Sequence, residues 1–297
     1  MNFLYQFIRF SRLHTIVGTS LSILALWLIA RELDGVFASV QYLLWTLATC
    51  LAANVYIVGL NQLIDVDIDR INKPYLPLAS GAWSLRTGRV VVLASLVLSL
   101  IGAALGNGWL LAVVLSSLLL GTLYSLPPMR LKRFPFWAAF CILAVRGLIV
   151  NLGLFLNFFT PVQTDPPIPT VIWTLTLLMF VYSILIAFFK DMPDLEGDRQ
   201  YGISTFSLRL GVGRIHRIGV TLLVALYLIA ALLPLVLGLE VNAWIFSGFH
   251  LLLLVALVVL SRRVDLSDRA SIARFYQGVW VLFFGEYIGM AVSVLVG

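Results

Sequence analysis

The sequence of 297 residues is strongly apolar: 61% of the residues are hydrophobic, only 11% are charged, and the mean hydropathy is +1.01. Soluble domains carry charge on about a quarter of their residues. This composition therefore excludes an ordinary soluble enzyme, a disordered chain and a nucleic-acid-binding protein, despite the formal net charge of +6. We expect an integral membrane protein.

Nine segments are long and apolar enough to cross a membrane as helices, since a span needs about 20 mostly apolar residues. Breaks at 106–108 and 238–242 separate segments that would otherwise merge. No stretch between the segments is long enough for a soluble domain, so we predict one all-α transmembrane bundle over 1–297. The predicted spans are 14–30, 42–64, 89–106, 108–126, 134–159, 168–190, 217–238, 243–261 and 275–296.

Lysine and arginine are distributed asymmetrically over the connections between these spans. Every Lys and Arg except Arg31 and Arg146 lies in the amino-terminal segment or in a connection on the same side of the membrane. Connections rich in Lys and Arg stay in the cytoplasm. We therefore predict that the N-terminus is cytoplasmic and that the C-terminus lies on the opposite side.

The first of two acidic motifs ends the second predicted span. Asn61, Asp65 and Asp69 recur at intervals of four residues, so on a helix they share one face, while Asp67 points to roughly the other side. Like charges at this spacing repel and destabilise a helix unless cations neutralise them. The motif therefore indicates a site for cations at the membrane boundary.

The second acidic motif ends the sixth span and repeats this pattern. Asp191, Asp194 and Asp198 are expected to share a helix face, with Glu196 offset from it. The pattern Asp-x-x-x-Asp-Arg occurs at 65–70 and again at 194–199, which argues against a solvated loop edge with scattered acids. Oxygen ligands in this number suit Mg²⁺.

Basic residues interleave with the acids and are expected to complete a diphosphate site. Metal ions with Lys and Arg bind phosphate oxygens, and Arg can do so in a bidentate manner. At the mouth of an apolar bundle, such a site fits an amphiphile whose allylic C–O bond breaks as diphosphate leaves. The alternative for each base is a role in topology or headgroup contact. The candidates are Arg70, Lys73, Arg130, Lys132, Lys190 and Arg199.

Other residues carry weaker indications of function. Glu286 lies deep in the ninth span and is expected to pair with Arg146 or to be held neutral. Aromatic faces stabilise cations, although core packing or lipid contact is the alternative for each aromatic residue here. The aromatic candidates are Tyr124, Phe155, Phe188 and Phe189.

Three segments resemble the UbiA superfamily of intramembrane aromatic prenyltransferases: 61–81, 124–133 and 190–199. Their residues are most similar to the homogentisate prenyltransferase branch, and within it to phytyltransferases of the cyanobacterial type. The resemblance extends over nearly the whole chain. Chlorophyll synthases of the same superfamily differ around both acidic motifs.

This resemblance implies a nine-helix bundle around a central cavity, closed by cytoplasmic cap loops. It also implies two Mg²⁺ ions, one held by each acidic motif. The implied metal ligands are Asn61, Asp65, Asp69, Asp191, Asp194 and Asp198. All of them except Asp191 are also the expected catalytic residues.

The implied reaction is prenylation of homogentisate by phytyl diphosphate, with loss of CO₂ and diphosphate, to give a tocopherol precursor. The membrane would be a plasma or thylakoid membrane. The carboxylate of the acceptor needs a cationic or hydrogen-bonding partner, for which Arg146 is the candidate, because an ionisable residue within a span is a functional candidate. Snorkelling or pairing inside the bundle is the alternative role for Arg146.

Two alternatives to this function stay open. The first keeps the chemistry and uses solanesyl or geranylgeranyl diphosphate, or a hydroxybenzoate or naphthoate acceptor. The second is a divalent-cation transporter, which would place acids in the middle of the spans, whereas these acids cluster at span ends. The oligomeric state is not predicted.

Overall fold

The computed structural model describes residues 2–34, 38–159 and 168–297, which form helices and no strands. Nine membrane-length apolar helical segments lie in these ranges, which confirms the predicted fold class. They are α2 (Leu13–Asp34), α3 (Val40–Ile64), α5 (Leu85–Ala104), α6 (Gly108–Ser125), the continuous segment of α7 (Pro135–Ile142), η2 (Leu143–Ile149) and α8 (Val150–Phe159), α9 (Thr170–Lys190), α12 (Val212–Leu237), α13 (Ala243–Arg262) and α14 (Arg269–Leu295).

Three spans begin four to six residues earlier than the hydropathy pattern predicts. Helix α5 starts at Leu85 rather than at 89, α12 at Val212 rather than at 217, and α14 at Arg269 rather than at 275. The added turns contain basic residues, which the hydropathy criterion rejects. Backbone hydrogen bonding nevertheless continues through them, because charged side chains at a helix end extend toward the aqueous boundary.

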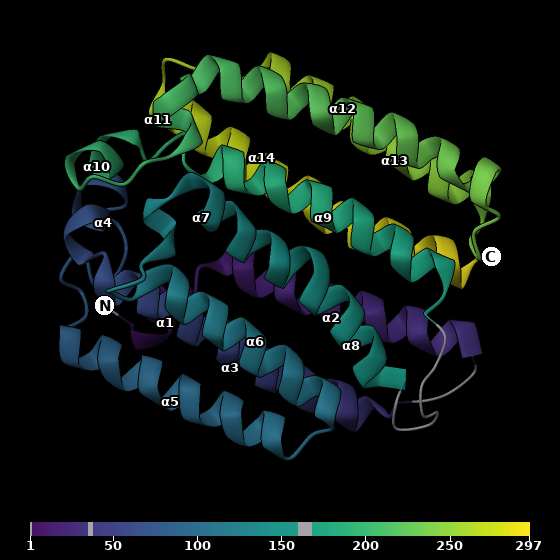
Figure 1. Ribbon diagram of the computed structural model, residues 1–297, viewed down its shortest axis with the longest axis horizontal. Coiled ribbons are helices and arrows are strands. Elements are labelled where there is room, and N and C mark those ends of the chain that lie inside the picture. Colours follow the sequence, from purple (N-terminus) through teal and green to yellow (C-terminus); the bar gives the residue numbers. More distant parts are fainter. Residues whose placement is uncertain (1, 35–37, 160–167) are drawn as a thin grey trace.

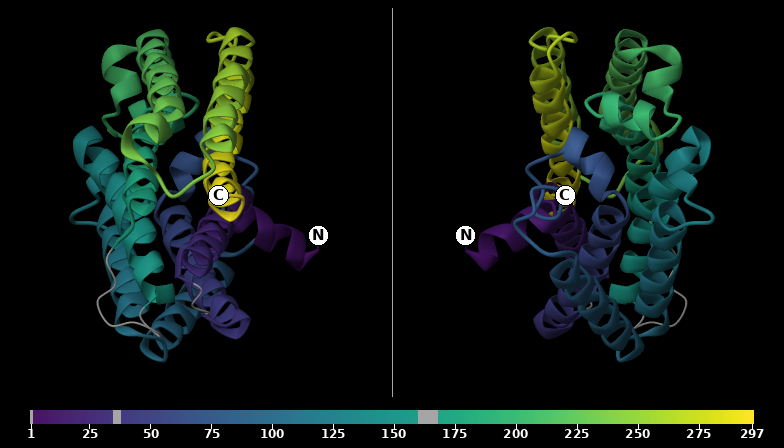
Figure 2. Two further views of the ribbon diagram at one scale, coloured as in Figure 1. Left: turned by 90° about the vertical axis from the view of Figure 1, so that its right-hand side faces the viewer. Right: turned by 90° about the vertical axis from the view of Figure 1, so that its left-hand side faces the viewer.

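Six of the spans form a closed ring. Around the ring, α2 contacts α3, α3 contacts α6, and α6 contacts α8. Helix α8 then contacts α9, α9 contacts α14, and α14 contacts α2. Helix α5 packs outside the ring on α3, and α12 and α13 pack on α9 and α14. Figure 2 shows the bundle from its two ends, with the short helix α1 (Phe3–Phe10) projecting sideways from it.

The fifth span contains a π-helical segment at η2. Gly147 lies within it, and a Cβ at this position would stand 2.8 Å from Phe180 Cα, so the segment packs closely on α9. A π-helical turn shifts the following side chains relative to an α-helix and is frequent at functional sites. Arg146 lies on this turn.

Short helices cap one end of the bundle. Helices α4 (Val66–Asn72), α10 (Leu195–Gln200) and α11 (Phe206–Leu210) lie together at the left of Figure 1, and the C-terminus lies at the other end. The backbone N–H of Gly197 donates to Asn72 Oδ1 at 3.0 Å, and Arg269 Nη2 donates to the carbonyl of Asn72 at 2.6 Å. Asn72 therefore joins α4 to α10 and to the start of α14. The 3₁₀ turn η1 (Leu131–Arg133) lies in the connection between α6 and α7.

Glu286 is paired inside the bundle, but its partner is not Arg146. His250 Nε2 on α13 lies 3.2 Å from Glu286 Oε2 on α14, and both side chains are almost fully buried. His250 Nδ1 is 2.7 Å from the carbonyl of Phe246, which fixes the ring. The predicted alternative of an Arg146–Glu286 pair is wrong, because the pairing of α13 with α14 brings a histidine to Glu286.

Replacing one member of this pair should destabilise the protein. We expect Glu286→Leu or His250→Leu to lower the free energy of unfolding in detergent by about 3 kcal/mol, because each change leaves a buried polar partner without its contact. The double variant should be markedly more stable than the sum of the two single changes predicts. Denaturant titration of the four proteins measures the coupling, and additive effects would contradict the pairing.

Candidate active site

The first acidic motif spans the junction of α3 and α4. Helix α3 ends at Ile64, and Asp65, with φ −106° and ψ 17°, links it to α4. Helical hydrogen bonds continue across the junction, from Asp65 N to Asn61 O at 3.0 Å and from Asp69 N to Asp65 O at 2.7 Å. The predicted common face is therefore preserved, and Asn61, Asp65 and Asp69 line one cleft.

The second motif does not lie on one helix, so the predicted helix face shared by its three aspartates is wrong. Helix α9 ends at Lys190 and α10 begins at Leu195. Pro193 lies between them and has no N–H to continue a helix. The three aspartates nevertheless line the same cleft as the first motif.

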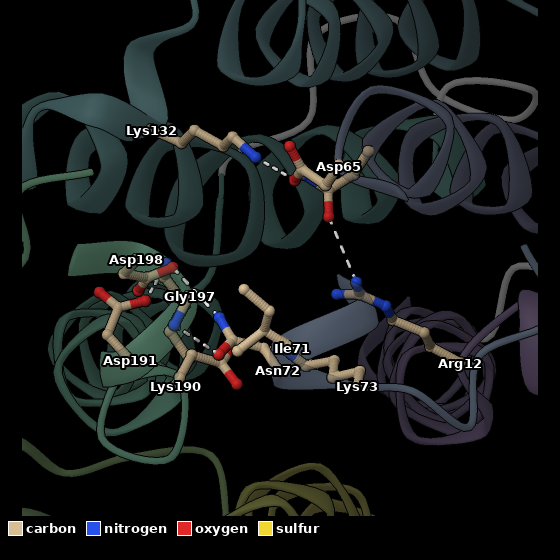
Figure 3. Close-up of polar contacts among 12 residues, drawn as sticks. Arg12, Asp65, Ile71, Asn72, Lys73, Lys132, Lys190, Asp191, Gly197 and Asp198 are labelled. Carbon is tan, nitrogen blue, oxygen red and sulfur yellow. Dashed lines mark hydrogen bonds and ion pairs between the residues drawn. The ribbon is translucent and has the colours of Figure 1, made fainter. Parts of the chain in front are cut away.

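The cleft has a volume of about 790 Å³ and lies at the capped end of the bundle. Figure 3 shows Asp65 with Lys132 on one side of it and Asp191, Lys190 and Asp198 on the other. The cleft thus brings together residues that are far apart in the sequence. Asn72 and Asp198, which both line it, are 126 positions apart along the chain.

Each motif carries carboxylates held by bases. Asp65 pairs with Arg130, whose Nη2 is 2.9 Å from Asp65 Oδ1, and with Lys132. In the second motif, Lys73 pairs with Asp194, and Lys190 Nζ lies 2.7 Å from Asp191 Oδ1. Four of the six predicted diphosphate-binding bases are therefore at the acids.

The other two predicted bases lie outside the cleft. Arg70 is 61% exposed and pairs with the equally exposed Asp67 at 2.6 Å. Arg199 is exposed on α10 and does not line the cleft. Both immediately follow an inward-facing aspartate, and the helical rotation of about 100° per residue turns the next side chain away.

Sequence reasoning missed the role of Arg12. Its Nη2 donates to Asn61 Oδ1 at 3.2 Å, and its side chain lines the cleft. The sequence shows Arg12 only as one of two bases before the first span. Its backbone has φ 53°, in the left-handed region, which turns the chain between α1 and α2.

Burial changes the proton affinities of the acids in the cleft. Desolvation raises the pKa of Asp69 to about 6 and the pKa of Asp198 to about 7, and it also raises the pKa of Asp191. Burial lowers the pKa of Lys132. For Lys73, burial alone would lower the pKa, but the Asp194 carboxylate raises it. A bound cation would favour the charged form of these acids.

The donor set fits Mg²⁺. Asp69 Oδ2 is buried without a hydrogen-bond partner, and the ligands that the two motifs offer are carboxylate and amide oxygens, which Mg²⁺ prefers. Within the described ranges no three His, Cys, Asp or Glu side chains form a ready metal cluster. The basic partners hold the carboxylates apart, so ligation requires the carboxylates to turn from those bases.

A second, apolar cavity of about 250 Å³ adjoins the cleft inside the helix ring. Tyr124 and His14 line both cavities, which places them at the junction. Arg146 and Trp280 line the apolar cavity only. Of the other predicted aromatic residues, Phe155 and Phe189 are fully buried and do not line either cavity, nor does Phe188.

A membrane bundle with a charged cleft that opens on an apolar cavity defines an intramembrane enzyme for amphiphiles with an anionic head. The sequence comparison specifies this class further. The chain belongs to the UbiA prenyltransferase family, which matches residues 21–285. It is therefore a prenyltransferase, as the resemblance of its motifs predicted.

Relatives agree with this assignment, and solved structures share the fold. The chain is 48% identical to homogentisate phytyltransferase of Synechocystis sp., over 95% of this chain and 93% of that protein. It is 38% identical to homogentisate geranylgeranyltransferase of Triticum aestivum, over 96% of this chain and 71% of that protein. A UbiA homolog from Archaeoglobus fulgidus, solved with GPP and Mg²⁺, has the same fold, with a TM-score of 0.65, 20% identity, and coverage of 97% of this chain and all of that one.

The raised pKa of Asp198 should make the stability of the metal-free protein depend on pH. Because the pKa is about 7 in the fold and near 3.8 in the unfolded chain, the stability contribution is complete below about pH 4 and is lost as pH rises through 7. The Asp198→Asn variant lacks this titration. In EDTA, the Tm of the variant minus the Tm of the wild type should therefore increase between about pH 5 and about pH 8. A constant difference in Tm would contradict the burial argument.

Proposed function

We propose that this chain transfers the phytyl group of phytyl diphosphate to homogentisate, in a Mg²⁺-dependent reaction that releases diphosphate and CO₂ and yields a tocopherol precursor. The observation that carries the proposal is a cleft lined by two acidic motifs and adjoining an apolar cavity. The identities of donor and acceptor rest on the relative from Synechocystis sp., which matches this chain over nearly its whole length.

In this proposal the two acidic motifs hold two Mg²⁺ ions. Bound there, Mg²⁺ neutralises the charge of the leaving diphosphate and favours cleavage of the allylic C–O bond. The bases that hold the carboxylates can turn to the diphosphate oxygens, and Arg can bind two of them. The proposed ligands are Asn61, Asp65 and Asp69 for one ion and Asp191, Asp194 and Asp198 for the other, with Lys73, Arg130, Lys132 and Lys190 on the diphosphate.

The atoms and electrons of the transfer balance without a further reactant. A C–C bond forms between C1 of the prenyl group and a ring carbon, and the diphosphate leaves with the electron pair of the C–O bond. Loss of CO₂ leaves an electron pair on the side-chain carbon, which takes up one proton, while the prenylated ring carbon loses one. The product is a methylated prenyl hydroquinone, and the apolar cavity keeps water from the reacting carbon.

A geranylgeranyl donor is the second candidate. The observation that favours it is the 38% identity to the geranylgeranyltransferase of Triticum aestivum. The two donors have the same diphosphate and allylic end and differ in the saturation of the tail. Competition between phytyl and geranylgeranyl diphosphate in one assay distinguishes them by the ratio of kcat/KM.

We also propose that the capped end of the bundle faces the cytoplasm. The charged cleft lies at this end, and the C-terminus lies at the other (Figure 1). The lysine and arginine residues of the chain are concentrated in the connections at this end, which is typical of a cytoplasmic face.

Conservative changes at inward-facing acids should abolish turnover, whereas the same changes at outward-facing acids should not. We expect Asp65→Asn and Asp198→Asn to reduce kcat by about 1000-fold or more, because each removes a carboxylate ligand of the proposed Mg²⁺ ions that neutralise the leaving diphosphate. The matched controls are Asp67→Asn and Glu196→Gln, whose side chains are exposed. Product formation from radiolabelled homogentisate measures all four.

Chelation and acceptor choice test the same proposal. EDTA should stop product formation, and Mg²⁺ should restore it. Product that forms equally well in EDTA would overturn the metal requirement. Product that forms only with hydroxybenzoate or a naphthoate would overturn the acceptor.

The position of the bases predicts different effects on donor binding. Lys73→Ala should raise the KM for the prenyl diphosphate by about tenfold or more, because it removes a cation from a partly buried site. Arg199→Ala should change this KM by less than about twofold, because an exposed charge is screened by solvent. Equal effects of the two changes would contradict the position of the cleft.

A further inference from the structure

Arg146 is a base inside a membrane span that has no carboxylate partner among the described residues. Its guanidinium carbon lies 4.8 Å from the ring centroid of Trp280, and its side chain lines the apolar cavity. The buried carboxylate of Glu286 is paired with His250. Among the described residues, Arg146 therefore has the face of an aromatic ring, and no carboxylate, beside its charge.

This arrangement differs from that of the bases that pair with the acidic motifs. Lys73, Arg130, Lys132 and Lys190 each lie on an aspartate. A charge in an apolar setting is costly unless it is paired, and charges inside spans mark binding sites. An anion that enters the cavity would supply the missing partner of Arg146.

The backbone around Arg146 holds it toward the cavity. It lies on the π-helical turn η2, and Gly147 packs against the backbone of Phe180 on α9. The amide of Asn151 donates to the carbonyl of Arg146 at 3.0 Å, and Asn151 accepts from Tyr287 at 2.8 Å. The side chain is thus presented from a rigid segment, as a binding group requires.

The cavity is of the right size and position for a single substituted aromatic ring. A cavity of about 150 Å³ holds benzene, so about 250 Å³ has room for a ring with small substituents. His14 and Tyr124 connect this cavity to the cleft. A ring bound beside Trp280 would therefore lie next to the proposed site of the allylic carbon.

We propose that Arg146 binds the carboxylate of the aromatic acceptor and, with Trp280, sets the orientation of its ring toward the cleft. The proposal rests on the proposed function, in which the acceptor is an aromatic acid. Because the carboxylate is lost as neutral CO₂, the contact is strongest before the reaction. Arg146 therefore determines acceptor affinity more than the rate of the chemical step.

The test compares a charged with a neutral ring ligand. Arg146→Gln should raise the KM for homogentisate by about 10- to 100-fold, because it removes a charge-assisted contact. The kcat and the KM for the prenyl diphosphate should change by less than about threefold. Phenylacetate should lose competitive inhibition by a similar factor, whereas methylhydroquinone, which has no carboxylate, should inhibit as before.

Two further variants control for folding and for charge. Arg146→Lys keeps the charge without the bidentate geometry and should show an intermediate KM. Arg86→Gln removes an exposed arginine at the start of α5 and should leave the KM for homogentisate unchanged. The Tm of each variant shows whether it folds. An unchanged KM for homogentisate in folded Arg146→Gln, or equal losses for phenylacetate and methylhydroquinone, would overturn the proposal.

Titration calorimetry with phenylacetate separates this proposal from the proposed function. Binding to the wild type that is lost in Arg146→Gln supports the carboxylate site even if homogentisate is not a substrate. If the wild type prenylates homogentisate but Arg146→Gln binds phenylacetate as tightly as the wild type does, the role of Arg146 is refuted and the proposed function stays intact. A wild type that binds no phenylacetate also refutes the carboxylate site.

Discussion

Carboxylates buried at the end of an apolar bundle need counter-charge, and the arrangement of the capped end satisfies this need. Asp65 is held by two bases from the connection between α6 and α7, and two acids of the other motif, Asp191 and Asp194, are each held by a lysine. The contacts of Asp65 and Asp194 join segments that the membrane spans separate. They also leave Asp69 with an unpartnered oxygen, where a cation would fit.

The helix ring gives this charged end its function. Its interior is apolar and adjoins the cleft, so a diphosphate head and a hydrocarbon tail meet different surroundings within a short distance. In the low-dielectric interior, charges act more strongly than in water. Cation-binding groups at the boundary can therefore act on a leaving group while the reacting carbon is protected from water.

Pattern and composition predicted the features that depend on local physics. The nine spans follow from the need of each apolar segment to satisfy its backbone inside lipid. The inward direction of Asp65 and Asp69 follows from helical spacing. The prediction failed where the chain leaves the helix: Pro193 separates Asp191 from α10, so the second motif reaches the cleft through a turn and not along a helix face.

The sequence by itself therefore determined the class of protein, its spans and its two acidic motifs, because these are set by composition and by intervals of a few residues. Only the tertiary structure decided which charges meet: Arg12 with Asn61, His250 with Glu286, and Arg146 with the ring of Trp280. The members of each pair come from segments that are far apart in the sequence. Their pairing depends on the packing of the helices around the ring, and residue spacing along the chain carries no information about it.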